Sequence, residues 1–282
     1  MTEQEQRDIA RLRRQIEELD EQAQLREGRI TELFAEAVAR EAELRDLEAV
    51  RDVLTPRELG PRPGLEMECA FIPAADGVAG DFYLVVSGPD DDSTVLAVGD
   101  VAGKGIEAAR RATFVRTSLV TFAGFVDEPC RLLELANQVL VERAGTSPVF
   151  VTAVVAAIRP AEGRLAWASA GHPPPLRLDT GEMLNGSRPT PPLGLNTSLS
   201  CDSGREELPA GSGVLLFTDG LTEAHRPRHE LFGERRVIDA VRAVAGSSPD
   251  AVVRRLEADV HAHAGEALGD DLCMVAARVE GA

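Results

Sequence analysis

Four aspartates stand at the edges of apolar segments, and each is next to a glycine or a second aspartate. They are Asp81 in GDFY, Asp100 in GDVAGKG, Asp219 in FTDGLTEA and Asp270 in GDDLCMV. An aspartate beside a glycine is common in ordinary turns, so any one of them alone indicates little. Four such sites at the ends of predicted strands indicate carboxylates that meet at one sheet edge. Convergent carboxylates repel one another in a low-dielectric cleft unless cations compensate them, and hard oxygen ligands suit Mg²⁺ or Mn²⁺.

Other kinds of active site have no clear signature in this sequence. The chain contains no H-E-x-x-H zinc motif, no glycine-rich nucleotide-binding pattern and no G-x-S-x-G nucleophile motif. His172, in the segment SAGHPPP, is predicted to be a structural turn residue rather than a catalyst or a ligand. The four cysteines lie far apart without a C-x-x-C pair. We therefore expect neither a disulfide framework nor a zinc-thiolate site, and a reducing cytoplasm is the expected location.

The charge of the chain argues against two classes of partner. Among 282 residues, 47 acidic side chains face 30 basic ones, which gives a formal net charge of −17. Such a surface repels nucleic acid and anionic lipid, so we expect no nucleic-acid partner and no membrane partner. The apolar runs are much shorter than the ~20 residues that a membrane-spanning helix needs, and we expect no secretory signal at the N-terminus.

The hydrophobic pattern of residues 66–282 predicts an α+β domain. Runs typical of β-strands cover 67–72, 81–86, 94–101, 150–158, 164–168, 213–218 and 271–279, and helical patterns cover 105–122, 128–143, 234–244 and 249–263. Strand groups interrupted by helix pairs favour helices packed outside one or two antiparallel sheets.

Residues 1–55 are predicted to form a separate long helix. Isoleucine or alanine at one heptad position and leucine at the other recur for about six heptads, which favours a parallel, self-associating coiled coil. The alternative is a single amphipathic helix that lies on the next domain. Prolines and glycines mark a linker at 56–65. We therefore expect a dimerising or regulatory coiled coil (1–55), this linker and a catalytic domain (66–282), with the chain forming a homodimer.

The motifs, in this order, resemble those of the SpoIIE-type (RsbU-like) serine/threonine phosphatases, a bacterial branch of the protein phosphatase 2C (PP2C, or PPM) superfamily. The resemblance also includes FVTA (150–153), ASAGHPP (168–174) and PLG (192–194), and it spans residues 66–279. It implies a PP2C-like β-sandwich of two antiparallel sheets flanked by helices. It also implies a centre of two Mn²⁺ or Mg²⁺ ions, whose metal-binding and catalytic residues are Asp81, Asp100, Asp219 and Asp270, with the main-chain carbonyl of Val101 as a further ligand.

The sequence departs from the family pattern at three positions. Ala79 replaces a glycine, Cys273 stands where threonine is usual, and Leu84 stands where an aspartate is common. The first and second are small changes. Leu84 removes a carboxylate near the expected centre and therefore bears on metal occupancy or rate.

The activity that this resemblance implies is hydrolysis of phosphoserine or phosphothreonine on a partner protein. The family's usual substrates are phosphorylated anti-sigma factor antagonists of the STAS type. Two metal ions can activate water for in-line attack on phosphorus, without a covalent enzyme intermediate. Two alternatives stay open: a catalytically weak relative that acts as a binding or scaffold module in the same pathway, and an acidic Ca²⁺-binding module, which lacks support because no D-x-[DN]-x-[DN]-G loop is present.

Overall fold

A computed structural model describes most of the chain beyond residue 58. The described residues are 59–74, 80–90, 92–103, 105–144, 150–186, 188–226, 230–265 and 268–281, together with the single positions Arg29 and Leu33. The chain divides into two units, residues 1–49 and 50–282. The coiled coil expected over 1–55 lies outside the described residues except for Arg29 and Leu33, which are both helical and exposed, so it stays a prediction.

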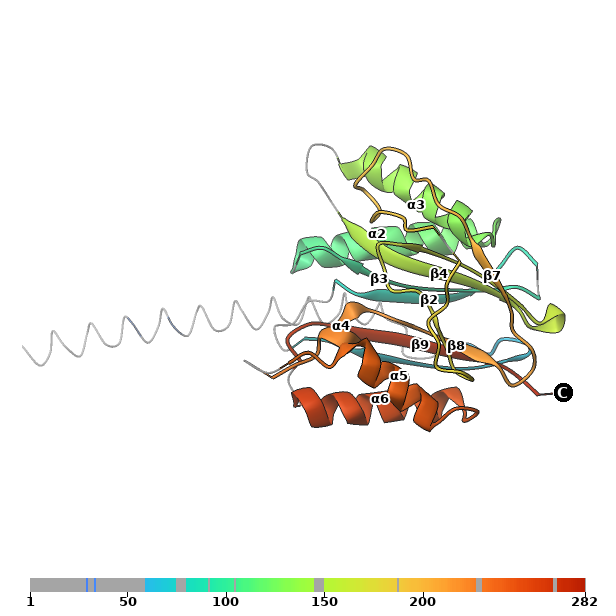
Figure 1. The fold of residues 1–282 in the computed structure, drawn as a ribbon. Coiled ribbons are helices and arrows are strands. Elements are labelled where there is room, and N and C mark those ends of the chain that lie inside the picture. Colours follow the sequence, from blue (N-terminus) through green and yellow to red (C-terminus); the bar gives the residue numbers. More distant parts are fainter. Residues whose placement is uncertain are drawn as a thin grey trace, which may run out of the picture. The chain divides into compact units, whose positions relative to one another are not determined.

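Two antiparallel sheets form the second unit (Figure 1). The first sheet has the order β2-β3-β4-β5-β7, and the second has the order β1-β9-β8-β6. The strands of the first sheet are β2 (Phe82–Ser87), β3 (Thr94–Val101), β4 (Val151–Arg159), β5 (Arg164–Ala170) and β7 (Gly204–Glu207). Those of the second are β1 (Leu65–Ile72), β6 (Leu176–Arg177), β8 (Gly213–Phe217) and β9 (Leu272–Val279).

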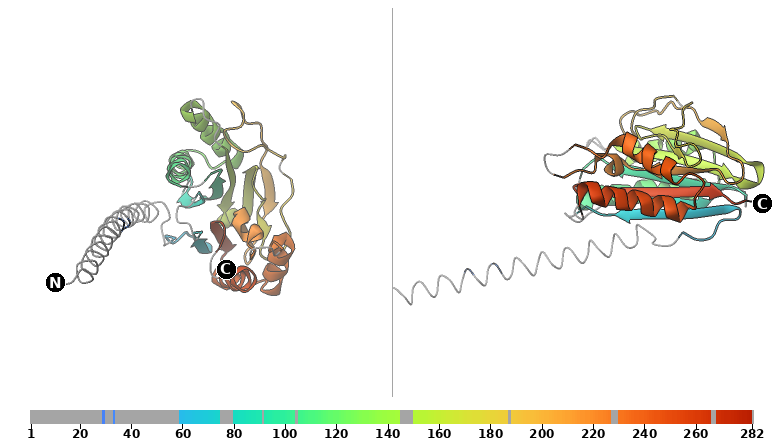
Figure 2. Two further views of the ribbon diagram at one scale, coloured as in Figure 1. Left: turned by 90° about the vertical axis from the view of Figure 1, so that its left-hand side faces the viewer. Right: turned by 60° about the horizontal axis from the view of Figure 1, so that its bottom comes forward.

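Helix pairs cover the outer faces of both sheets (Figures 1 and 2). Helices α2 (Ile106–Ala123) and α3 (Pro129–Ala144) pack on the first sheet, and α5 (Gly233–Ala243) and α6 (Pro249–Ala264) lie on the side of the second. Two short helices complete the described elements, the 3₁₀ turn η1 (Pro160–Glu162) and α4 (Asp219–Glu223). The result is a four-layer arrangement of helices, sheet, sheet and helices, which confirms the α+β sandwich that the sequence predicts.

The apolar core has three layers because each sheet is buried on two faces. In β4, Val154 and Ile158 belong to the layer between the sheets, whereas Ala153 and Val155 belong to the layer under α2 and α3. A third layer lies between the second sheet and the helices α5 and α6. Since side chains alternate across a strand, a strand buried on both faces must be apolar throughout, which explains the continuous apolar run of β4.

The structure differs from the sequence expectations in a few elements. The short strands β6 and β7 and the helix α4 were not predicted. The structure also pairs Cys130 and Cys201 in a disulfide with a Cα–Cα distance of 5.8 Å, so the expectation that this chain has no disulfide was wrong. The start of α3 and the segment before β7 lie side by side only in the folded chain, and the spacing of 71 residues gives no local signal for the pair. No helix among the described residues is long and apolar enough to cross a membrane.

Candidate metal centre

The ends of four strands bring the predicted aspartates to one end of the sandwich. In the first sheet, Phe82 is opposite Gly99 in the β2–β3 register, so Asp81 and Asp100 flank this pair on neighbouring strands. The backbone N–H of Val101 donates to the carbonyl of Gly80 at 3.3 Å and continues the pairing to this end. We call this place, where β3 and β8 end and β2 and β9 begin, the carboxylate end.

The second sheet supplies the other two aspartates. Phe217 at the end of β8 is opposite Met274 of β9, and the backbone N–H of Thr218 donates to the carbonyl of Cys273 at 2.9 Å. Helix α4 then starts at Asp219, beside the residues that precede β9. A Cβ atom at Gly220 would come within 1.7 Å of the carbonyl oxygen of Asp271, so the glycine of the TDG motif is what allows the two segments to approach so closely.

The charges of these side chains influence one another across the two sheets. Burial first, and then the charges of Asp219, Asp270 and Asp271, raise the pKa of Asp100 from 3.8 to about 6. Burial also raises the pKa of Asp81 well above its usual value, with Asp100 among the contributing charges. Burial and Asp270 raise the pKa of Asp219. All four predicted aspartates therefore belong to one electrostatic cluster, and a cation bound there would favour the ionised forms.

The donor set fits a divalent cation. A Cβ atom at Gly80 would lie 3.0 Å from the carbonyl oxygen of Val101 and 3.1 Å from Oδ1 of Asp100, so these two oxygens border one small space that only a glycine leaves open. Among the described residues, Cys130, Glu134 and Cys201 are the group whose possible ligand atoms all lie within 4.8 Å of one another. No three of the described aspartates are as close together. The aspartates thus form a looser set, as suits Mg²⁺ sites, which use one or two carboxylates and keep several waters.

The two adjacent aspartates before β9 have different environments. Asp270 is exposed and available to a ligand, although its Oδ1 accepts the backbone N–H of Asp271 at 2.9 Å. Asp271 is buried, and its two carboxylate oxygens accept the backbone N–H groups of Ala74 and Gly80, each at 2.8 Å. The position of Asp270 is compatible with the ligand role that the sequence suggests, whereas Asp271 supports the backbone next to Asp81.

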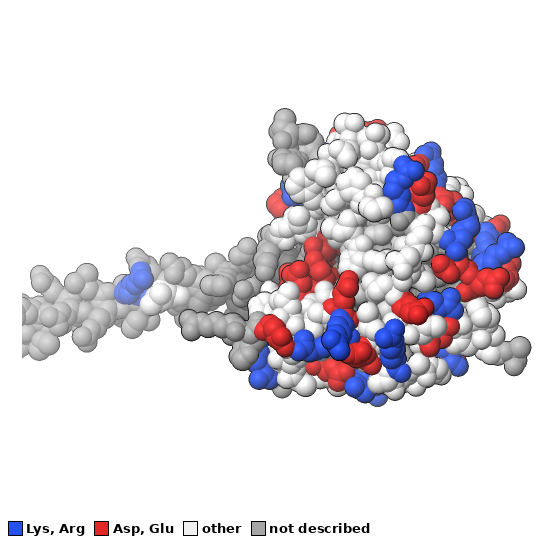
Figure 3. Space-filling view, viewed as in Figure 1, with Lys and Arg blue, Asp and Glu red and all other residues white. Residues whose placement is uncertain are grey.

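Acidic side chains gather near α4 on the surface drawn in Figure 3, and two of the predicted ligands, Asp100 and Asp219, are partly exposed. The carboxylate end is therefore open to solvent and to a substrate. Lys104 of the GDVAGKG motif lies outside the described residues.

Leu84 does not face the carboxylate end. It is buried in the apolar layer under α2 and α3, in one cluster with Val115 and Ala112 of α2. Since side chains alternate along β2, Leu84 is on the same face as Phe82 and on the opposite face from Tyr83, which packs between the sheets. An aspartate at this position would be surrounded by apolar side chains in this chain.

His172 has a structural role, as the sequence predicts. It is buried; its Nε2 lies 2.9 Å from the carbonyl oxygen of Phe217 and its Nδ1 lies 2.9 Å from the hydroxyl of Thr152. A carbonyl can only accept, so Nε2 carries the proton and the Thr152 hydroxyl donates to Nδ1. Burial lowers the pKa of His172 to about 4, which keeps the ring neutral.

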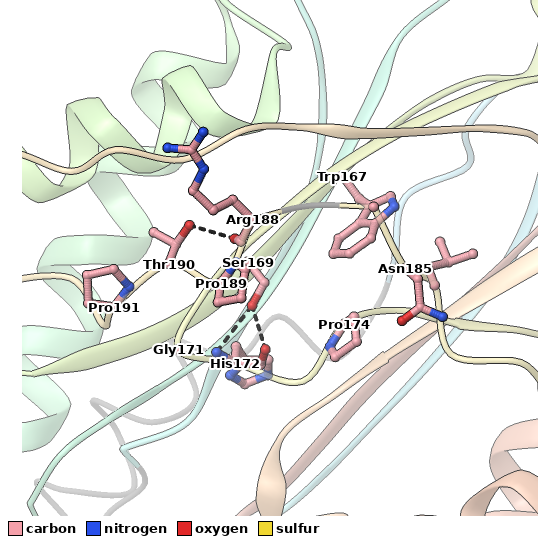
Figure 4. Close-up of a pocket in the computed structure, with 12 residues that line it drawn as sticks. Trp167, Ser169, Gly171, His172, Pro174, Asn185, Arg188, Pro189, Thr190 and Pro191 are labelled. Atoms are coloured by element: carbon pink, nitrogen blue, oxygen red, sulfur yellow. Dashed lines mark hydrogen bonds between the residues drawn. The ribbon is translucent and has the colours of Figure 1, made fainter.

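A pocket of about 510 Å³ borders His172 (Figure 4). The hydroxyl of Ser169 fixes the backbone of His172 there, because it accepts the N–H at 3.2 Å and donates to the carbonyl. Trp167, Pro174 and Thr190 are among the lining residues, and none of the four predicted aspartates is. The pocket therefore lies beside the carboxylate end rather than containing it.

The sequence predicts the four aspartates as ligands, which stays a prediction, but it gives no sign of the residues that contact Asp81 and its neighbour Gly80. Thr218 and Asp271 both lie inside recognised motifs, FTDGLTEA and GDDLCMV, yet neither was assigned a role. The contacts that reveal their role join segments 137 and 191 residues apart. No local pattern carries that information.

Comparisons with known proteins agree with this geometry. Residues 90–280 match the family model of Stage II sporulation protein E (SpoIIE). The chain is 26% identical over 176 residues to the phosphoserine phosphatase RsbU of Bacillus subtilis, covering 62% of this chain and 51% of RsbU, so it spans about half the length of that relative. Its fold resembles the RsbU and RsbW domains of Rv1364c from Mycobacterium tuberculosis, with a TM-score of 0.64, 28% identity and coverage of 78% of this chain and 62% of that one. The SiaA-PP2C domain of Pseudomonas aeruginosa shares the fold with a TM-score of 0.74 and 21% identity, over 86% of this chain and 98% of that one.

Proposed function

Because the chain belongs to the SpoIIE family, whose model matches residues 90–280, we propose that it is a metal-dependent protein serine/threonine phosphatase. The observation that carries the proposal is the placement of Asp81, Asp100, Asp219 and Asp270 at strand ends on one end of the sandwich, where burial and neighbouring charges raise the pKa of the first three. Asp81 is buried, and a buried carboxylate that is neither neutralised nor compensated by a cation is costly.

The proposal assigns two tasks to the carboxylate end, which are to bind the cations and to leave room for a phosphate group. Asp81, Asp100, Asp219, Asp270 and the carbonyl of Val101 would hold two Mn²⁺ or Mg²⁺ ions. Divalent cations, when bound, supply the Lewis-acid chemistry that makes water a nucleophile at neutral pH and offsets charge on phosphoryl oxygens. The partial exposure of Asp100 and Asp219 and the exposure of Asp270 leave this side of the centre open to a phosphorylated side chain.

Cysteine chemistry offers no competing mechanism at this site. Cys273 is the cysteine next to the carboxylates; it is buried, and burial and the Asp81 charge raise its thiol pKa well above the usual value. A protonated, inaccessible thiol is a poor nucleophile. Direct attack by water on phosphorus therefore suits these residues better than a thiophosphate intermediate.

The proposed substrate is phosphoserine or phosphothreonine on an anti-sigma factor antagonist of the STAS type. The relative named as a phosphoserine phosphatase, RsbU, and the likeness to RsbU and RsbW domains support this choice. The Cys130–Cys201 disulfide removes the cysteine argument for a reducing cytoplasm as the location. A homodimer formed through the coiled coil of residues 1–55 is part of the proposal. The scaffold alternative relied on Leu84, which is buried in the helix-side core and does not line the carboxylate end.

Substitution of two ligands tests the activity. With Mn²⁺ and a phosphoserine substrate, the turnover of Asp100→Asn and of Asp219→Asn should each fall below that of the wild type. Removal of a residue that only supports a metal ligand costs about 10–100-fold, and loss of a ligand itself should cost more. Asp239→Asn is a matched control, because Asp239 is exposed on α5 and pairs only loosely with Arg235 at 3.8 Å. A folded Asp100→Asn variant with near-wild-type turnover, or faster release of phosphate from phosphotyrosine than from phosphoserine, would contradict the proposal.

A further inference from the structure

The two halves of the proposed metal centre are on different sheets. Asp81 and Asp100 belong to the first sheet, whereas Asp219 and Asp270 follow and precede strands of the second. Apolar packing between sheets is non-directional and does not by itself fix carboxylates to within the few tenths of an ångström that a metal site needs. Polar contacts that join the sheets at the carboxylate end are therefore of special interest.

Thr218 makes such a contact with its side chain. Its hydroxyl lies 2.7 Å from Oδ2 of Asp81 and 3.0 Å from the backbone nitrogen of Cys273. The N–H of Cys273 can only donate, so the hydroxyl accepts this bond and its single proton is directed to Asp81. The carbonyl of Cys273, at 3.4 Å, is a more distant acceptor for the same proton.

The position of Thr218 in the fold makes this use of the hydroxyl unusual. Thr218 is the N-cap residue of α4, where a threonine side chain commonly accepts a backbone N–H of the helix. Here the side chain makes no capping bond and instead reaches across to the first sheet. The same residue precedes Asp219, so one short segment carries a ligand of one half and contacts a ligand of the other.

Two further side chains join the sheets at the same end. Asp271, next to β9, accepts the N–H of Gly80, the residue before Asp81, at 2.8 Å. His172, which follows β5, contacts the carbonyl of Phe217 in β8 and the hydroxyl of Thr152 in β4. Thr152 is opposite Asp100 in the β3–β4 register. The Thr218 contact is on a proposed ligand itself, Asp81. The other contacts are on residues that lie one or two positions along the chain from a proposed ligand, or opposite one in the strand register.

We propose that Thr218 is a positioning residue that sets the separation of the two halves of the metal centre, with Asp271 and His172 as its supports. Thr218 holds Oδ2 of Asp81, so that Oδ1 would be the oxygen available to a cation. It ties this carboxylate to the segment that carries Asp219. The inference rests on the proposed function, since it concerns the same cation site.

Thr218→Val and Thr218→Ser separate this role from simple packing. Valine has nearly the shape of threonine but lacks the hydroxyl, whereas serine keeps the hydroxyl. We expect the full-length Thr218→Val protein to bind Mn²⁺ about 10–100-fold more weakly than the wild type in titration calorimetry, as for other residues that orient metal ligands. Thr218→Ser should bind within about threefold of the wild type.

The measurement needs no turnover, so it distinguishes the possible failures. If Thr218→Val binds Mn²⁺ as the wild type does, the positioning role is wrong while the metal centre stands. If its melting temperature falls in chelator but its Mn²⁺ affinity is unchanged, Thr218 is structural only. If the wild type binds no divalent cation, the proposed metal centre itself fails. Should Thr218→Val not fold, Thr218→Ala removes the hydroxyl without placing a methyl group against Asp81, and the same comparison with Thr218→Ser applies.

Discussion

Reduction of the disulfide between Cys130 and Cys201 should weaken the domain without unfolding it. The bond joins the first turn of α3 to the segment before β7, 71 residues later. In the chain-entropy description, closing a loop of this length lowers the entropy of the unfolded chain by roughly 15 cal/mol/K. The disulfide therefore contributes about 4 kcal/mol to the free energy of unfolding at 25 °C.

Other contacts hold the same segment in place after reduction. The buried side chain of Asn137 in α3 donates to the carbonyl of Asn196 at 3.1 Å and accepts the N–H of Gly194 at 2.8 Å. The hydroxyl of Ser203 accepts the N–H of Cys130 at 3.1 Å. The folded structure should thus persist, and the loss should arise in the unfolded chain. For a domain of this size, 1 kcal/mol shifts the melting temperature by roughly 2–4 °C, so the expected fall is roughly 8–16 °C.

Thermal unfolding with and without reductant measures the effect, and thiol titration in denaturant establishes the oxidation state. Oxidised protein should show two free thiols, Cys69 and Cys273, and reduced protein all 4 cysteines. Cys201→Ser should abolish the response to reductant, and Cys69→Ser should keep it. Equal melting temperatures in both buffers, with two thiols titrating before reduction, would refute the loop-closure reasoning; four thiols titrating in air-exposed protein would refute the disulfide.

Three further predictions concern the carboxylate end and the N-terminal segment. In chelator, the free energy of unfolding should fall as the pH rises from 3.8 to about 6, because the raised pKa of Asp100 makes the folded state bind a proton that the unfolded state releases. Asp100→Asn should reduce this dependence in denaturant titrations and raise the melting temperature at pH 7, and an unchanged profile would contradict the assignment. Gly220→Ala should lower the melting temperature and weaken Mn²⁺ binding at least tenfold, since its Cβ would overlap the Asp271 carbonyl; Gly124→Ala, with its nearest contact at 3.6 Å, should do neither. Truncation at Gly64 should convert a dimer to a monomer in sedimentation, and turnover per site should change several-fold if the helix regulates rather than tethers; a truncated protein that still dimerises would exclude the coiled coil as the interface.

Local patterns were sufficient for the main secondary structure. The predicted strand at 94–101 and the predicted helix at 249–263 correspond to β3 (Thr94–Val101) and α6 (Pro249–Ala264). These elements are long and strongly patterned, so their own side chains decide their conformation. The two-residue strand β6 and the five-residue helix α4 are too short for such a signal and form because their neighbours hold them.

The chemistry proposed for the site also comes from the sequence, because it depends on residue types at strand ends. Asp81, Asp100, Asp219 and Asp270 each stand beside an apolar run, and the order of their motifs indicated the family. The sequence did not show how their neighbours are used. Asp270 and Asp271 are adjacent and chemically identical, and only packing buries the second against the backbone of Gly80.

The remaining features depend on contacts between distant parts of the chain. The face on which Leu84 lies and the reach of Thr218 to Asp81 follow from strand register and from the stacking of two sheets. The pairing of Cys130 with Cys201 follows from the packing of α3 beside the segment before β7. A one-residue change of register would turn every side chain of a strand, Leu84 included, to the opposite face. The sequence by itself therefore determined the main elements and the residue types proposed as ligands, while the tertiary structure decided which side chains meet, because register and packing are properties of the whole domain rather than of any segment.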